Sequence, residues 1–171
     1  MTVEQKDLAL DVLASGTSAL GLEKAQNIML QEDVLRDEMG KGPDHRNRER
    51  YSLQVYGTPS ARGAWAWRWE GHHLSLSFTL VDDVVVSTTP SAFSAEPNTV
   101  PSGPYEGMGV LKEEETLARQ VFTDLSPTNR GVALVSDTSP GNIMSARGNE
   151  ADVRARMAGV ALGDLPQVQA D

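Results

Sequence analysis

The sequence predicts an α+β fold in which helices pack on one face of an antiparallel β-meander of three to four strands. Two observations carry this prediction. Apolar residues recur at helical spacing through the first forty positions, and between Tyr51 and Ser87 they alternate with polar ones, in runs separated by short turn sequences. With 171 residues, 39% of them hydrophobic, the chain can bury one core, so we expect a single domain over residues 1–171.

Two helices are expected before the sheet. Thr2 and Gln5 have the spacing of a capping box, which predicts a first helix to about Ala14. A second helix is predicted from about Leu20 to Met39, where Gly40 follows as a terminator.

Glu32 falls in the middle of the apolar stripe of the second predicted helix. A carboxylate is rarely buried without a partner. Either a core arginine such as Arg68 pairs with Glu32, or the helix delivers this carboxylate to a functional pocket.

Residues 63–80 form the centre of the predicted sheet. Its three tryptophans, Trp65, Trp67 and Trp69, alternate and therefore share one face of an extended strand. From residue 74 onward the apolar positions are even-numbered instead of odd-numbered. A slip of one residue moves every side chain to the opposite face, so a bulge or a tight turn must intervene. Gly71 tolerates either.

This break would re-aim Glu70, His72 and His73. Imidazole and carboxylate ligands suit Zn, Fe or Mn, and the absence of cysteine excludes thiolate sites. His72, His73 and Glu32 are therefore the candidate ligands of a divalent metal. Two observations argue against such a site. Neighbouring histidines in a strand point to opposite faces, and alternating tryptophans ordinarily form a layer of the core without any function in binding.

Further side chains complete the predicted site. Glu70 and Arg68 are the candidate catalytic residues, with Arg68 suited to bind an anionic group bidentately. Trp67, Trp69 and Glu96 are candidate ligand-binding residues. Glu96 lies in a proline- and glycine-rich connection between Pro90 and Gly109, a length typical of loops that cover sites. We expect the whole cluster to lie in a dry hollow beneath the helices.

A third helix is predicted from Leu111, with three glutamates in its first turn where the helix dipole favours them. Its expected buried stripe consists of Leu117, Ala118, Val121 and Leu125. Ser126-Pro127 predicts the start of a fourth helix, and residues 149–157 predict a short one.

The net charge of −9 opposes binding to nucleic acid or to an anionic membrane. No apolar run approaches the ~20 residues of a membrane span. The first residues lack the pattern of a secretory signal, so we expect a cytoplasmic protein.

Several stretches resemble a bacterial family known as domain of unknown function 3500. They are Gly57-Thr-Pro-Ser60, Trp65-Ala-Trp-Arg-Trp-Glu-Gly-His-His73 with the alternating run to Thr79, Ser87-Thr-Thr-Pro90, Phe93-Ser-Ala-Glu-Pro97, the helix around Ile28–Arg36, and residues 113–130. The resemblance covers about residues 25–144. It implies little about activity, since none is established for the family. It also implies a further segment rich in His, Tyr and Asn that this chain lacks. Ser94 stands where the family usually has glycine.

Three functions follow as hypotheses. The first is a metal-dependent enzyme. The second is a non-catalytic module completed by a protein partner or by a second copy of the chain. The third is a metal-free binder that holds a small molecule between the tryptophans and the loop of residues 90–109.

Overall fold

The computed structural model describes residues 2–42, 45–138 and 158–165. The chain divides into two compact units, residues 1–112 and residues 113–171. Within the described ranges, no helix has the length and apolar character needed to cross a membrane.

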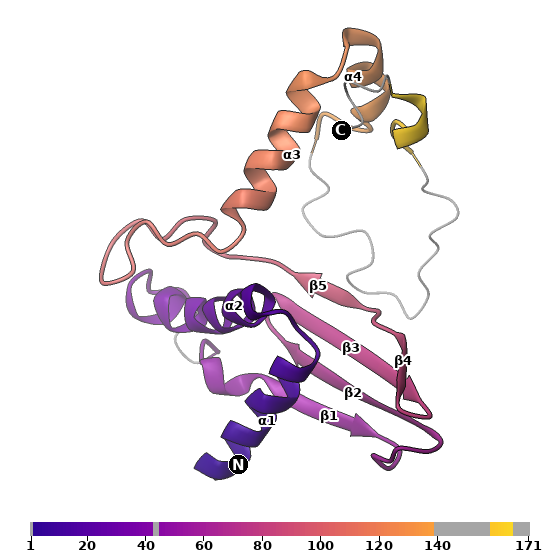
Figure 1. Cartoon of the computed structure of the whole chain (residues 1–171). Coiled ribbons are helices and arrows are strands. Elements are labelled where there is room, and N and C mark those ends of the chain that lie inside the picture. Colours follow the sequence, from indigo (N-terminus) through magenta and orange to yellow (C-terminus); the bar gives the residue numbers. More distant parts are fainter. Residues whose placement is uncertain (1, 43–44, 139–157, 166–171) are drawn as a thin grey trace. The chain divides into compact units, whose positions relative to one another are not determined.

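The first unit contains an antiparallel sheet (Figure 1). Its strands are β1 (Ser52–Tyr56), β2 (Ala64–Gly71), β3 (Leu74–Val81), β4 (Val84–Ser87) and β5 (Ser91–Phe93). The first four form a meander, and β5 pairs with the beginning of β3, on the edge that β4 occupies further along. The predicted α+β class and meander are confirmed. The short strand β5 lies in a stretch that we expected to be an irregular loop.

A two-residue turn, His72-His73, explains the change from odd to even apolar positions. Gly71 pairs with Leu74 across it, and Trp69 pairs with Leu76. Cross-strand partners share a face, so the turn keeps both apolar sets on the same side of the sheet. Of the two devices that the sequence allowed, the tight turn is the one present.

Helices α1 (Val3–Ser15) and α2 (Ala19–Asp37) cover that apolar face (Figure 1). The capping box at Thr2 is formed as predicted. Leu13, Ile28, Trp67 and Leu76 belong to one buried cluster, which joins both helices to β2 and β3. At the end of α1 the contact is close: a Cβ at Gly16 would lie 2.6 Å from the Trp67 ring. Packing on the tryptophans therefore fixes both helices above the sheet.

The second unit contains α3 (Lys112–Asp124), α4 (Pro127–Ala133) and the 3₁₀ turn η3 (Leu162–Asp164). Ser126 caps α4, as predicted. The expected buried stripe of α3 is wrong in part: Leu125 is buried, but Leu117 and Val121 are exposed. Helical spacing identifies an apolar face, but only a packed neighbour buries it. The short helix expected over residues 149–157 lies outside the described residues.

Candidate functional site

The candidate site is built on the His72-His73 turn. His73 adopts a left-handed backbone conformation with φ of 66°, which histidine tolerates better than most residues. Two hydrogen bonds hold the turn: the Tyr51 hydroxyl donates to the His72 carbonyl, and the Ser94 amide donates to the His73 carbonyl at 2.8 Å. The turn is thus fixed from β1's side and from β5's side.

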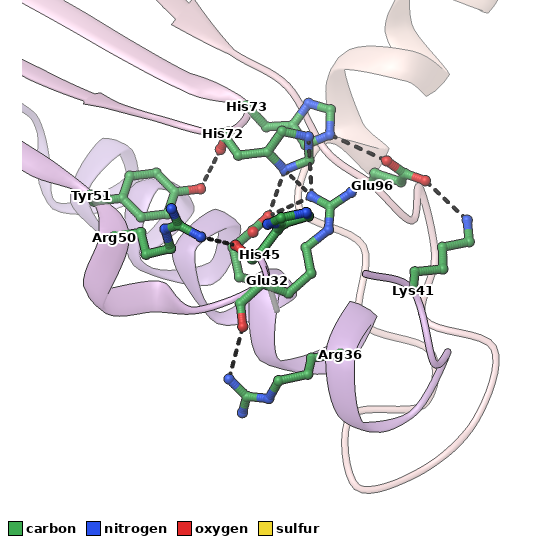
Figure 2. A network of polar contacts seen from close by, with 10 residues as sticks. Glu32, Arg36, Lys41, His45, Arg50, Tyr51, His72, His73 and Glu96 are labelled. Atoms are coloured by element: carbon green, nitrogen blue, oxygen red, sulfur yellow. Dashed lines mark hydrogen bonds and ion pairs between the residues drawn. The ribbon is translucent and has the colours of Figure 1, made fainter. Parts of the chain in front are cut away.

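The two imidazoles lie together. Their ring centroids are 3.7 Å apart, with the ring planes tilted by 52° (Figure 2). The objection that neighbouring histidines diverge applies to an extended strand, whereas these two residues form the turn itself. The turn therefore brings both imidazoles to the same place.

Glu32 enters the cluster from α2 and is only 4% exposed. Its Oε1 lies 2.5 Å from Nδ1 of His72 and 3.2 Å from Nη1 of Arg46. The cationic partner of Glu32 is thus Arg46, from the charged connection after α2, and not Arg68 as considered from the sequence. Arg36 donates to the Arg46 carbonyl at 2.9 Å, which holds this connection against α2.

Nδ1 of His72 has incompatible neighbours. It lies 2.6 Å from the Arg46 guanidinium and 2.5 Å from the Glu32 carboxylate. The guanidinium can only donate and the carboxylate can only accept. A proton on Nδ1 would be donated to Glu32 but would face the donor groups of Arg46. A lone pair on Nδ1 would accept from Arg46 but would face the Glu32 oxygen. Arg46 and Glu32 therefore compete for this nitrogen.

Glu96 completes the cluster from the segment after β5. Its Oε2 lies 3.5 Å from Nε2 of His73, and its Oε1 accepts from Lys41 at 3.0 Å. A hydrogen bond from Lys41 holds the pKa of the Glu96 carboxyl below its ordinary value, and the nearby His73 lowers it further. Gln31 of α2 donates to the Pro97 carbonyl at 2.8 Å and anchors the segment.

His73, His72 and Glu96 can each offer one ligand atom, and these atoms all lie within 4.8 Å of one another. Burial lowers the pKa of His73, and the neighbouring His72 lowers it further. A lowered pKa keeps the ring neutral, the form in which histidine binds metals. The set of two imidazoles and one carboxylate is one that zinc and non-haem iron accept.

The predicted catalytic pair lies elsewhere on the sheet. Arg68 and Glu70 alternate with the tryptophans and so lie on the opposite face of β2. Arg68 Nε is 2.5 Å from Glu70 Oε2, and the Ser75 hydroxyl donates to the same oxygen at 2.8 Å. The structure does not bring this network together with the imidazoles.

The two tryptophans of the predicted site have different surroundings. Trp67 stacks on Phe78 in the core, with ring centroids 4.3 Å apart. Trp69 is equally buried, but its indole lines a pocket between the helices and β2. Among the described residues, the ring contacts join Trp67 to Phe78 and His72 to His73, and none joins an indole to an imidazole.

The histidine cluster lies at the surface and not in a dry hollow. The His72 side chain is 39% exposed, and Glu32 beneath it is the one buried member of the cluster. Sequence reasoning missed Arg46, Lys41 and Tyr51. The signal for Lys41 and Arg46 was the density of charge between residues 40 and 50, which we interpreted as a solvated connection.

The fold and this cluster define an α+β protein with a surface site of two histidines and a carboxylate. The family model described as Protein of unknown function (DUF3500) matches residues 1–171, and the chain belongs to this family. Neither the search of curated proteins nor the search of solved structures found a match.

Proposed function

We propose that the protein binds one divalent transition-metal ion through His72, His73 and Glu96, as the centre of a metal-dependent enzyme. The observation that carries the proposal is the convergence of three ligand atoms within 4.8 Å of one another on a turn fixed from two sides. Two imidazoles and one carboxylate leave coordination positions for water or substrate, which both hydrolytic zinc sites and non-haem iron sites require.

Glu32 has a supporting role in this proposal. Carboxylates that accept from a ligating histidine fix its tautomer and its orientation. A proton on Nδ1 of His72 satisfies Glu32, 2.5 Å away, and leaves the Nε2 lone pair for the ion. Glu32 thus orients the His72 imidazole, and its negative charge offsets part of the charge of the metal ion.

Arg46 and Lys41 are cations that the ion must displace. Arg46 Nη1 lies 3.2 Å from Nε2 of His72, and Lys41 bonds to the proposed ligand Glu96. The pair of Lys41 and Glu96 is exposed on both sides, and such pairs contribute at most about 1 kcal/mol. After displacement both cations remain beside the metal, where they favour an anionic substrate. This role was assigned to Arg68 from the sequence.

The test is metal binding by chelator-treated protein. Titration with Co²⁺, Zn²⁺ and Mn²⁺, followed by calorimetry and by the Co²⁺ absorption spectrum, should give one ion per chain. His73→Ala and Glu96→Ala should each weaken binding by at least about tenfold. His45→Ala is the matched control, because it removes the remaining histidine of the chain from an exposed position outside the ligand set.

Arg46→Gln distinguishes a metal site from a cluster that merely hydrogen-bonds. Removing the competing charge should strengthen metal binding, whereas a purely structural cluster would only lose stability. Binding of much less than one ion per chain, or equal affinities for wild type, His73→Ala and His45→Ala, would refute the proposal.

A further inference from the structure

A second candidate site lies on the helix side of β2. A half-open pocket of about 300 Å³ is lined by residues of α1, α2, the 3₁₀ turn η1 (Arg48–Arg50) and β2, with Tyr51 between η1 and β1. Its apolar lining consists of Ala9, Leu10, Met29, Tyr51 and Trp69. The volume is at the lower end of the range for small-molecule sites, so the pocket suits a compact ligand.

Trp69 carries an unsatisfied donor at this pocket. The residue is 5% exposed, and its buried Nε1 has no hydrogen-bond partner among the residues that the structure describes. Buried polar groups are nearly always paired, and each exception requires an explanation. Because this atom has essentially no accessible surface, a ligand could accept from it only if neighbouring side chains moved.

The charged side chains of the pocket favour an anion. Lys6 and Arg48 contribute positive charge to the lining and Glu49 contributes negative charge. Arg48 is paired with Asp33, which lies outside the lining, so Lys6 is the cation through which the pocket can bind an anion. Lys6 Nζ lies 2.6 Å from Glu49 Oε1, and both side chains are exposed. An exposed ion pair contributes little stability, so Lys6 can exchange Glu49 for a ligand carboxylate at small cost.

We propose that this pocket binds a small carboxylate with an apolar body, such as a medium-chain or aromatic acid. The body packs on Met29, Tyr51 and Trp69, and the carboxylate pairs with Lys6. The pocket is separate from the histidine cluster, although the Tyr51 ring lines the pocket while its hydroxyl donates to the His72 carbonyl. The proposal therefore does not rest on metal binding.

The test uses octanoate, octanol and octylamine, each below its micelle concentration, with chelator-treated full-length protein. Octanoate should change the tryptophan fluorescence in a saturable way and bind more tightly than the neutral or cationic analogue. Trp69→Phe should abolish most of the fluorescence change. Trp65→Phe is the matched control and should retain it, because Trp65 does not line the pocket.

Two further variants separate shape from charge. Ala9→Leu fills the pocket and should weaken octanoate binding by at least about tenfold. Lys6→Met should weaken octanoate binding about fivefold and leave octanol binding unchanged, as expected for one surface ion pair. Lys24→Met, which removes a cation of α2 outside the pocket, should change neither. Absence of saturable binding, equal affinity for the three probes, or an unaffected Ala9→Leu variant would overturn the proposal.

Discussion

The meander contains two tight turns of the same length, and only one of them carries a candidate site. His72-His73 joins β2 to β3, and Asp82-Asp83 joins β3 to β4. Left-handed backbone occurs in both, with φ of 66° at His73, 49° at Asp82 and 66° at Asp83. Left-handed backbone thus occurs at one residue of the first turn and at both residues of the second, and the two turns differ further in what surrounds them.

The surroundings differ in packing and in charge. The residue before the first turn, Gly71, contacts the buried ring of Tyr51, while the residue before the second turn, Val81, is 38% exposed. The first turn meets carboxylates from α2 and from the segment after β5. At the second turn, the Asp82 carboxylate accepts from the Gly63 amide at 2.8 Å. A tight turn becomes a candidate site when other elements are packed around it.

The largest expected effect tests that packing. A Cβ at position 71 would lie 2.2 Å from Cδ1 of Tyr51, whose ring is buried and whose hydroxyl is tied to the turn. Gly71→Ala should therefore reduce the free energy of unfolding by about 3 kcal/mol. Denaturant unfolding followed by tryptophan fluorescence measures this, since all three tryptophans lie in the first unit.

The control for this prediction is the equivalent position of the second turn. Val81→Ala should cost less than about 1 kcal/mol, because the side chain is partly exposed. In a Tyr51→Ala background, Gly71→Ala should cost much less than in wild type, as expected for a direct clash. Equal costs at positions 71 and 81 would show that the two turns are packed alike.

The second prediction compares two carboxylates on opposite faces of the sheet. Glu32 is buried beneath the first turn and pairs with Arg46. Glu70 pairs with Arg68 on the open face, where both side chains are 36% exposed. Breaking a buried ion pair costs several kcal/mol, but Arg46 retains access to water, so Glu32→Gln should cost about 2 kcal/mol.

Glu70→Gln is the matched control and should cost less than about 1 kcal/mol. Both changes conserve side-chain size, so the difference in unfolding free energy reports the environment of the charge. If Glu70→Gln were the more costly variant, the open-face network and not the turn would be the more strongly organised cluster.

The same contrast shows how far the sequence could predict the molecule. Period-two alternation and the position of Gly71 predicted the meander and the break, because both follow from local geometry. The partner of Glu32 was harder to predict: Arg68 was considered as one possible partner, although alternation places Arg68 and the tryptophans on opposite faces of β2. Arg46 could not be predicted, since its place depends on how the charged connection folds back onto α2.

The smallest expected effect concerns the protonation of His73. Burial, reinforced by the neighbouring His72, lowers the pKa of His73 from its ordinary value of 6.5. The folded state thus favours the neutral ring, and the unfolded state binds the proton more readily. The contribution of His73 to the free energy of unfolding is therefore fully present above pH 6.5. It is lost as the pH falls through the lower pKa of the folded state.

Wild type should therefore lose more unfolding free energy between pH 7.5 and pH 5.5 than His73→Asn, in which the group is absent. Asparagine tolerates the left-handed backbone of this turn. Glu96, which faces His73, also has a lowered pKa, but its contribution is lost only below its ordinary value of 4.5, outside this interval.

Asp83→Asn, compared with wild type at pH 7.5, controls for placing asparagine in a left-handed turn. Denaturant melts at the two pH values decide the matter, and an identical loss in wild type and His73→Asn would mean that burial at the first turn does not perturb this imidazole.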